Sequence, residues 1–162
     1  MNGTGDIRPL RPSDRQPLRD LLARTGMFSP EEVGIALELI DTVLQVPGQK
    51  DYLINVLEHE GKVAGYYCVG PTPATAGTYD MYWIAVDPSV QGNGAGTRLN
   101  THAEELIASR GGRLIVVETS SRQQYTPTRT FYERRGYTET ARIRGYYRPD
   151  DDLVVYCKYL TP

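Results

Sequence analysis

The hydrophobic pattern alternates between helix-like and strand-like segments along the chain. From Val33 to Leu44, apolar residues recur at spacings of four, three and four, which is the period of an amphipathic helix. Ser29-Pro30-Glu31-Glu32, just before this stripe, has the pattern of a capping box with proline at the first helical position. Similar signals predict three further helices: one between Ser13 and Gly26, one carrying Leu99 to Ile107, and a short one between Thr126 and Gly136.

The segments between these helices are rich in β-branched and aromatic residues, which is typical of strands. We predict strands over residues 7–10, 52–58, 63–69, 79–86, 114–117, 137–147 and 153–160. Glu60-Gly61-Lys62 predicts a hairpin, and the last two strands are expected to pair antiparallel. This order of elements predicts an α/β (α+β) protein with a mixed sheet and helices on both of its faces.

Length and composition limit the possible classes of protein. The chain has 162 residues, and we expect one domain over residues 1–162. Eighteen basic and twenty acidic side chains give a net charge of −2, so no overall positive field would attract nucleic acid or a membrane surface. Cys68 and Cys157 lack a partner at metal spacing, and no apolar run approaches the roughly 18 residues of a spanning helix. We therefore expect a cytoplasmic monomer or homodimer without a metal site.

A glycine-rich segment, Gln91-Gly92-Asn93-Gly94-Ala95-Gly96, lies between a predicted strand and a predicted helix. Backbone amides at the start of a helix can bind phosphate when no side chain obstructs its approach. A tight connection without a ligand is the alternative. Thr97-Arg98 after the last glycine gives no support to a P-loop, which needs Lys followed by Ser or Thr. The glycine spacing also differs from that of the dinucleotide-binding fingerprint.

Two motifs in this order resemble those of the GCN5-related N-acetyltransferase (GNAT) superfamily. The glycine segment looks like its Q/R-x-x-G-x-G/A signature. Phe131-Tyr132-Glu133-Arg134-Arg135-Gly136-Tyr137 is similar to its second motif, F-Y-x-x-x-G-F/Y. The chain departs from the family at Tyr125 and Thr128, where Asn and Ala are frequent. The resemblance covers nearly the whole chain.

The resemblance implies a mostly antiparallel sheet with a parallel pair at the cofactor cleft. It also implies acetyl transfer from acetyl-CoA to a primary amine, carried by a small molecule, a peptide N-terminus or a lysine. The main-chain N–H of Val86 would stabilise the oxyanion. Acetyl-CoA would contact Ala85, Val86, Gln91, Gly92, Asn93, Gly94, Ala95, Gly96, Thr97 and Arg98. A non-catalytic acyl-CoA-binding module of the same fold is the alternative.

Asp80, Glu118 and Tyr132 are the candidates for proton transfer. An aliphatic ammonium has a pKa near 10.4, so a carboxylate or an ordered water has to remove its proton before attack. Asp80 lies on the strand before the glycine segment and Glu118 follows the next strand, and both positions match sites where family members carry a base. Tyr132 resembles the family tyrosine that protonates the leaving thiolate. Purely structural roles for these three side chains are the alternatives.

Overall fold

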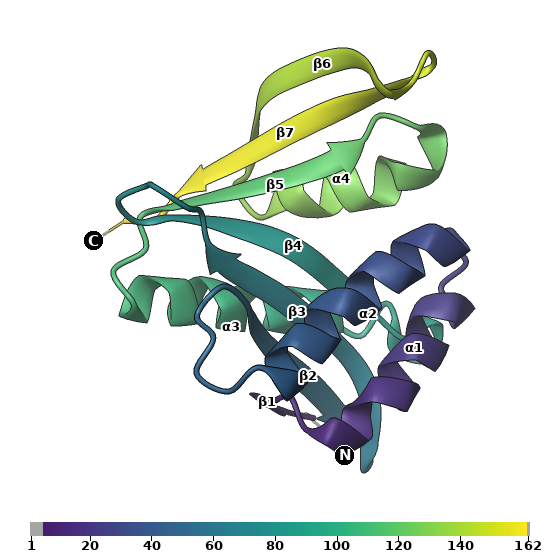
Figure 1. The fold of residues 1–162 in the computed structure, drawn as a ribbon. Helices are drawn as coiled ribbons and strands as arrows, with labels where there is room; N and C mark the ends of the chain where they lie inside the picture. The colour runs from purple at the N-terminus through teal and green to yellow at the C-terminus, as the bar shows by residue number, and fades with distance from the viewer. Residues whose placement is uncertain (1–4, 162) are drawn as a thin grey trace.

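The computed structural model describes residues 5–161, which form a seven-stranded sheet with helices on both of its faces (Figure 1). The order of helices and strands is the one predicted from the sequence, with short 3-10 turns added at Pro12–Asp14, Pro88–Val90 and Gln123–Tyr125. The elements are β1 (Asp6–Pro9), α1 (Arg15–Arg24), α2 (Pro30–Gln45), β2 (Leu53–His59), β3 (Lys62–Pro71), β4 (Thr78–Val86), α3 (Ala95–Ser109), β5 (Leu114–Ser120), α4 (Thr126–Arg134), β6 (Thr138–Arg148) and β7 (Asp151–Tyr159).

Neighbouring strands in the sheet follow the order β1-β2-β3-β4-β5-β7-β6. Every neighbouring pair is antiparallel except β4 and β5, which run parallel. Parallel strands need a crossover connection, and α3 supplies it between β4 and β5. The mixed sheet with a parallel pair is therefore confirmed.

The start of α2 follows the local signal in the sequence. The hydroxyl of Ser29 accepts a hydrogen bond from the Glu32 N–H at 3.2 Å, and the Glu32 carboxylate accepts one from the Ser29 N–H at 2.7 Å. Pro30 occupies the first helical position, so the predicted capping box is confirmed. None of the helices within residues 5–161 combines the length and the apolar character that crossing a membrane requires.

The sheet separates two hydrophobic clusters. One packs α1 and α2 on one face and includes Leu22, Ile40 and Tyr66. The other packs α3 and α4 on the opposite face and includes Leu99 and Tyr132. Figure 1 shows α1 and α2 in front of the sheet and α3 and α4 behind it. Because successive side chains of a strand alternate between faces, each points to either the α1/α2 side or the α3/α4 side.

Strand β5 continues past its predicted end at Val117. Glu118 pairs with Val155 of β7, and Ser120 pairs with Leu153. The apolar run stops at Val117, so the hydrophobic pattern gave no sign of the pairing that follows. Glu118 therefore lies inside the strand, whereas the sequence placed it directly after the strand.

Candidate active site

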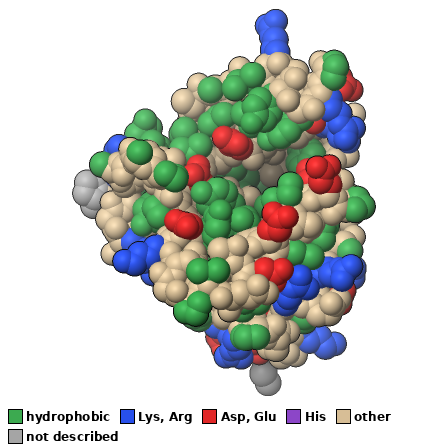
Figure 2. All heavy atoms as spheres, viewed as in Figure 1, with side chains coloured by type: hydrophobic (Ala, Val, Ile, Leu, Met, Phe, Trp, Pro, Cys, Tyr) green, Lys and Arg blue, Asp and Glu red, His purple; other side chains and the backbone are tan. Residues whose placement is uncertain are grey.

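Strands β4 and β5 pair only at their beginnings and then separate. Pairing ends where Asp80 lies opposite Val116, whereas β4 continues to Val86 and β5 to Ser120. Figure 1 shows the two strands diverging, and Figure 2 shows a hollow in the surface of the same face of the molecule. The backbone of residues 81–86 is therefore unpaired on the side toward β5.

The main-chain N–H of Val86 points into this opening. The Asp87 N–H donates to the carbonyl oxygen of Ala64 at 2.8 Å, and Val86 lies opposite Gly65 in the same register. Hydrogen-bonded and non-hydrogen-bonded pairs alternate along an antiparallel ladder, so the N–H and C=O of Val86 face away from β3. Nε2 of Gln91 donates to the Val86 carbonyl oxygen at 3.2 Å. The Val86 N–H is thus a hydrogen-bond donor directed between β4 and β5.

The glycines before α3 serve two different structural purposes. Gly92 and Gly94 have φ angles of +84° and +75°, a left-handed conformation that other residues adopt at a cost. Gly96 has an ordinary helical conformation, but a Cβ at this position would lie 3.0 Å from Cε2 of Phe131. Two glycines therefore shape the loop, and the third allows α3 and α4 to approach closely.

The N-terminus of α3 carries free backbone donors. The Arg98 N–H bonds to the carbonyl oxygen of Gly94 at 3.0 Å, so the amides of Ala95, Gly96 and Thr97 precede the first bond inside the helix. Gly94 at the cap position has no side chain to satisfy them. These amides and the positive end of the helix dipole form a site suited to a phosphate group.

Arg135, at the end of α4, reaches this helix terminus and was not a candidate from the sequence. Its Nη2 donates to Oγ1 of Thr97, its Nη1 donates to the Phe131 carbonyl oxygen at 2.8 Å, and its guanidinium carbon lies 3.7 Å from the centre of the Phe131 ring. Burial lowers the pKa of Arg135, and the charge of Arg134 adds to this effect. Within residues 5–161, no carboxylate lies within ion-pair distance of Arg135, and Glu104, which pairs with Lys158, raises the pKa of Arg135 only from farther away.

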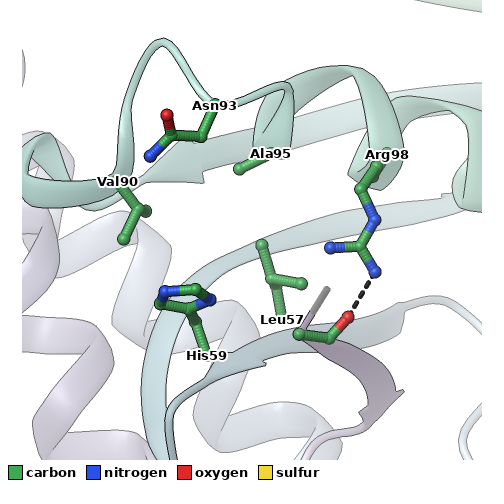
Figure 3. Close-up of a pocket in the computed structure, with 7 residues that line it drawn as sticks. Leu57, His59, Val90, Asn93, Ala95 and Arg98 are labelled. Carbon is green, nitrogen blue, oxygen red and sulfur yellow. Dashed lines mark hydrogen bonds between the residues drawn. The ribbon is translucent and has the colours of Figure 1, made fainter. Parts of the chain in front are cut away.

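Arg98 is directed away from the glycine loop. Its Nη2 donates to the carbonyl oxygen of Gly5, next to β1 (Figure 3). A small pocket of about 50 Å³ beside this contact is lined by Leu57, His59, Val90, Asn93 and Ala95 as well as Arg98 and Gly5. A polar groove of about 830 Å³ continues from it toward α1 and contains the ion pairs Arg8–Asp14 and Arg24–Asp87. Arg11, Asp20 and Lys62 also line this groove and form no ion pair with another described residue.

Tyr132 lies on the α3/α4 side, under the point where β4 and β5 separate. Its side chain is 3% exposed and belongs to the same hydrophobic cluster as Met81 and Val117. Its ring makes edge contacts with Phe131 and Tyr137 at centroid distances of 5.3 and 5.2 Å. Burial raises the pKa of Tyr132 well above its ordinary value, and its hydroxyl makes no hydrogen bond to another described residue.

Asp80 lies on the α1/α2 side, because its neighbours Tyr79 and Met81 both belong to the α3/α4 cluster. Its Oδ2 accepts a hydrogen bond from the Thr72 hydroxyl at 2.7 Å and a longer one from the Tyr82 hydroxyl at 3.3 Å. These contacts fix the carboxylate at the start of the opening, with Oδ1 left for another donor.

Glu118 lies on the same side as Asp80. Its neighbour Val117 belongs to the α3/α4 cluster, and Val116, two residues before Glu118, lies opposite Asp80. Glu118 is therefore displaced from Asp80 by about 6.6 Å along the strand direction. The two residues are also separated sideways by the distance between β4 and β5. Glu118 is exposed and forms no ion pair with another described residue. Among residues 5–161, no three or more His, Cys, Asp or Glu side chains gather as a metal site would require.

The sequence matches a known family and a curated protein. The family model described as an acetyltransferase (GNAT) domain matches residues 50–139. A 5-NmdU N-acetyltransferase from Pseudomonas phage PaMx11 is 31% identical over 92 residues, which span 57% of this chain and 61% of that protein. The match therefore covers less than two thirds of the relative's length.

Solved structures share the fold over nearly the whole chain. A protein from Desulfovibrio desulfuricans that is assigned to the GNAT family of acetyltransferases superposes with a TM-score of 0.93 at 39% identity, covering 96% of this chain and 99% of that one. A GNAT family acetyltransferase from Elizabethkingia anophelis with acetyl-CoA bound superposes with a TM-score of 0.72 at 16% identity, covering 97% and 99%. The second similarity concerns the fold alone.

Proposed function

Because the chain belongs to the GNAT family of acetyltransferases, we propose that it transfers an acetyl group from acetyl-CoA to a primary amine. The observation that carries this proposal is the opening between β4 and β5, which starts beyond Asp80 and Val116. A free backbone donor, the Val86 N–H, faces this opening, and β4 leads from it into the glycine loop.

The phosphates of acetyl-CoA would bind at the glycine loop. The amides of Ala95, Gly96 and Thr97 supply donors without a helical partner, and Arg135 supplies a positive charge that forms no ion pair with another described residue. Arg98 is less suited to this role, because its guanidinium is directed to the Gly5 carbonyl oxygen. We therefore propose Arg135, in preference to Arg98, as the arginine that contacts the phosphates.

The chemistry would take place where β4 and β5 separate. Bound acetyl-CoA supplies a thioester carbonyl, and the Val86 N–H would stabilise the negative charge that develops on its oxygen. The amine nitrogen forms the new C–N bond while the C–S bond breaks. The ammonium first gives one proton to a base, and the neutral amine then attacks. The leaving thiolate takes a proton from Tyr132, and the second proton that the nitrogen loses restores the Tyr132 phenol. The products are the N-acetylated amine and the free thiol.

Burial has two consequences for Tyr132 as the acid. The raised pKa keeps its phenol protonated throughout the physiological pH range, so the proton is available. The same raised pKa makes the phenol a weaker acid, but a thiolate in the same apolar surroundings also binds its proton more tightly. The hydroxyl has no hydrogen bond to give up among the described residues.

Asp80 and Glu118 both remain candidates for the base, with an ordered water as the third. Asp80 is held by Thr72 and Tyr82 beside the opening, which favours a fixed catalytic position. Glu118 is exposed on the same face and is free to meet an incoming ammonium. A division of labour, in which one carboxylate binds the amine and the other deprotonates it, also fits this arrangement.

The experiment that tests the proposed function is thiol release from acetyl-CoA in the presence of amines. The amines should include small alkylamines, a lysine peptide, a peptide with a free N-terminus and 5-NmdU, which the curated relative's name suggests. Amine-dependent release supports the proposal. Binding of acetyl-CoA without release for any amine would instead identify an acyl-CoA-binding module.

A further inference from the structure

Aromatic side chains border the opening between β4 and β5 on its α1/α2 side. Two of them, Tyr82 and Trp83, lie at a β-bulge in β4. Cys68 pairs with Trp83 and Val69 pairs with Met81, so Tyr82 has no partner on β3. The extra residue lets two successive side chains share one face. The Tyr82 hydroxyl bonds to Asp80 on the α1/α2 side, and Trp83 packs against the cluster on that same side. Tyr82 is 38% exposed.

The loop between α1 and α2 connects the two edges of the opening. Phe28 lies against the Trp83 ring of β4, with a centroid distance of 5.2 Å. Its neighbour Met27 accepts a hydrogen bond at 3.1 Å from the hydroxyl of Tyr125, in the segment that follows β5. One loop therefore contacts both sides of the opening, through Phe28 on the β4 side and through Met27 on the β5 side. An aromatic ring, Trp83 or Tyr125, lies at each of these contacts.

Tyr147, near the end of β6, brings a further ring to the β5 side. It is 46% exposed and makes an edge contact with Tyr146 at 5.0 Å between centroids. Burial raises the pKa of Tyr147 to about 12, and the nearby charge of Glu118 adds to the shift. Tyr125 and Asp151 also lie close enough to affect it. The register agrees with this position, because Arg148 pairs with Asp151 at the start of β7, and Ser120 at the end of β5 pairs with Leu153, two residues farther along β7. Tyr147 therefore lies at the end of the sheet toward which β5 runs beyond Glu118.

The charges around these rings are mainly negative. Glu118 has no ion-pair partner among the described residues, and Asp80 keeps one oxygen free of hydrogen bonds from them. Glu32 and Asp151 act on Tyr125 as negative charges, with Arg122 as a positive one. In Figure 2, acidic side chains surround the hollow, its walls are largely hydrophobic, and most Lys and Arg side chains lie farther out.

Resting on the proposed function, we infer that the acceptor is a primary ammonium carried on a planar aromatic body. We call the surrounding rings the aromatic rim: Phe28, Tyr82, Trp83, Tyr125 and Tyr147. Ring faces and edges bind a planar group more favourably than an aliphatic one of equal size, and they also attract a cation. The carboxylates of Asp80 and Glu118 bind the ammonium, and the rim binds the body that carries it.

Trp83 is the single tryptophan of the chain, so its fluorescence reports on the rim without requiring turnover. The titration uses benzylammonium, cyclohexylmethylammonium and benzyl alcohol as probes, on the protein alone and with CoA. We expect benzylammonium to bind at least about fivefold more tightly than either other probe. The cyclohexyl probe tests the planar ring, and the alcohol tests the charge. Equal affinities for all three probes would overturn the inference.

Substitutions in the aromatic rim then show which side chains produce the preference for benzylammonium. Tyr147→Leu should weaken benzylammonium binding roughly two- to tenfold and leave cyclohexylmethylammonium nearly unchanged. Tyr82→Leu should weaken benzylammonium more than cyclohexylmethylammonium, although both lose some affinity because Tyr82 also helps to hold Asp80. Tyr159→Leu is the control, because Tyr159 is exposed at the opposite end of β7. A preference that persists in both rim variants would also contradict the inference. Thiol release is measured separately, so failure of acetyl transfer and failure of aromatic selection give different results.

Discussion

A Cβ placed on Gly96 would lie 3.0 Å from Cε2 of Phe131, so the first turn of α3 touches the ring on which the Arg135 guanidinium rests. This contact links the two sequence motifs in space. The glycine loop supplies amides without helical partners, and the second motif supplies the ring and the cation beside them. The phosphate site we propose is therefore built from both motifs.

Replacing Arg135 with glutamine should weaken acetyl-CoA binding by about tenfold or more, because a charge-assisted contact to phosphate would be lost. The measurement is calorimetric titration at two salt concentrations. Arg134→Gln is the matched control, since Arg134 is exposed on the adjacent position. Equal affinities for the two variants would remove Arg135 from the phosphate site.

Gly94→Ala should destabilise the protein by about 1–2 kcal/mol, because alanine is strained at a φ of +75°. Gly34→Ala makes the same substitution inside α2, where an added Cβ meets nothing within 4 Å. That control should be stabilising by about 0.5–1 kcal/mol. Thermal unfolding of the two variants should therefore shift in opposite directions, and a shared direction would contradict the assigned backbone role of Gly94.

The carboxylates predict a pH dependence of the rate. At neutral pH, Asp80→Asn or Glu118→Gln should lower kcat/KM by roughly 10²–10⁴-fold if that residue is the base. The deficit should shrink as the pH approaches the pKa of the amine, near 10.4, since solvent then supplies the neutral nucleophile. Asp150→Asn, in the exposed turn before β7, serves as the control. A constant deficit across this range would assign the residue to amine binding.

Tyr66 predicts a loss of stability at alkaline pH. Burial raises its pKa well above the ordinary value of 10.0, and its buried hydroxyl has no hydrogen-bond partner within residues 5–161. Above pH 10 the folded chain keeps a proton that the unfolded chain has lost, so stability falls as the pH rises. Tyr66→Phe should reduce this fall and leave stability at pH 7 unchanged or raised by about 1 kcal/mol. Unfolding at pH 7 and pH 11 provides the measurement, and a steeper alkaline fall in the variant would contradict this explanation.

Much of the fold could be predicted because its signals are local. Ser29 and Glu32 lie three residues apart and cap α2 by themselves, and the glycine loop is contained in one short segment. The end of β5 was missed because Glu118 belongs to the strand through pairing with Val155, a contact across the sheet. Local pattern determines where elements begin, and tertiary pairing determines how far they extend.

The candidate site was predictable only in part, for the same reason. Asp80 and Glu118 were candidates from the sequence, and the structure places both on the α1/α2 side beside the opening. The contact between Arg135 and Thr97 joins residues 38 positions apart, and no spacing rule relates them. The nearness of Tyr147 to Glu118 likewise depends on how β6 and β7 fold back on β5.

The most direct test of the account is to quantify free thiol and N-acetylated benzylamine together, for the native protein and for Tyr132→Phe. We expect equal amounts of the two products from the native protein. The variant should keep its thermal stability and slow by roughly 10²–10⁴-fold, because only a proton donor is lost. Thiol release without acetylated amine would contradict acetyl transfer, and an undiminished rate in Tyr132→Phe would contradict the role of Tyr132 as the acid.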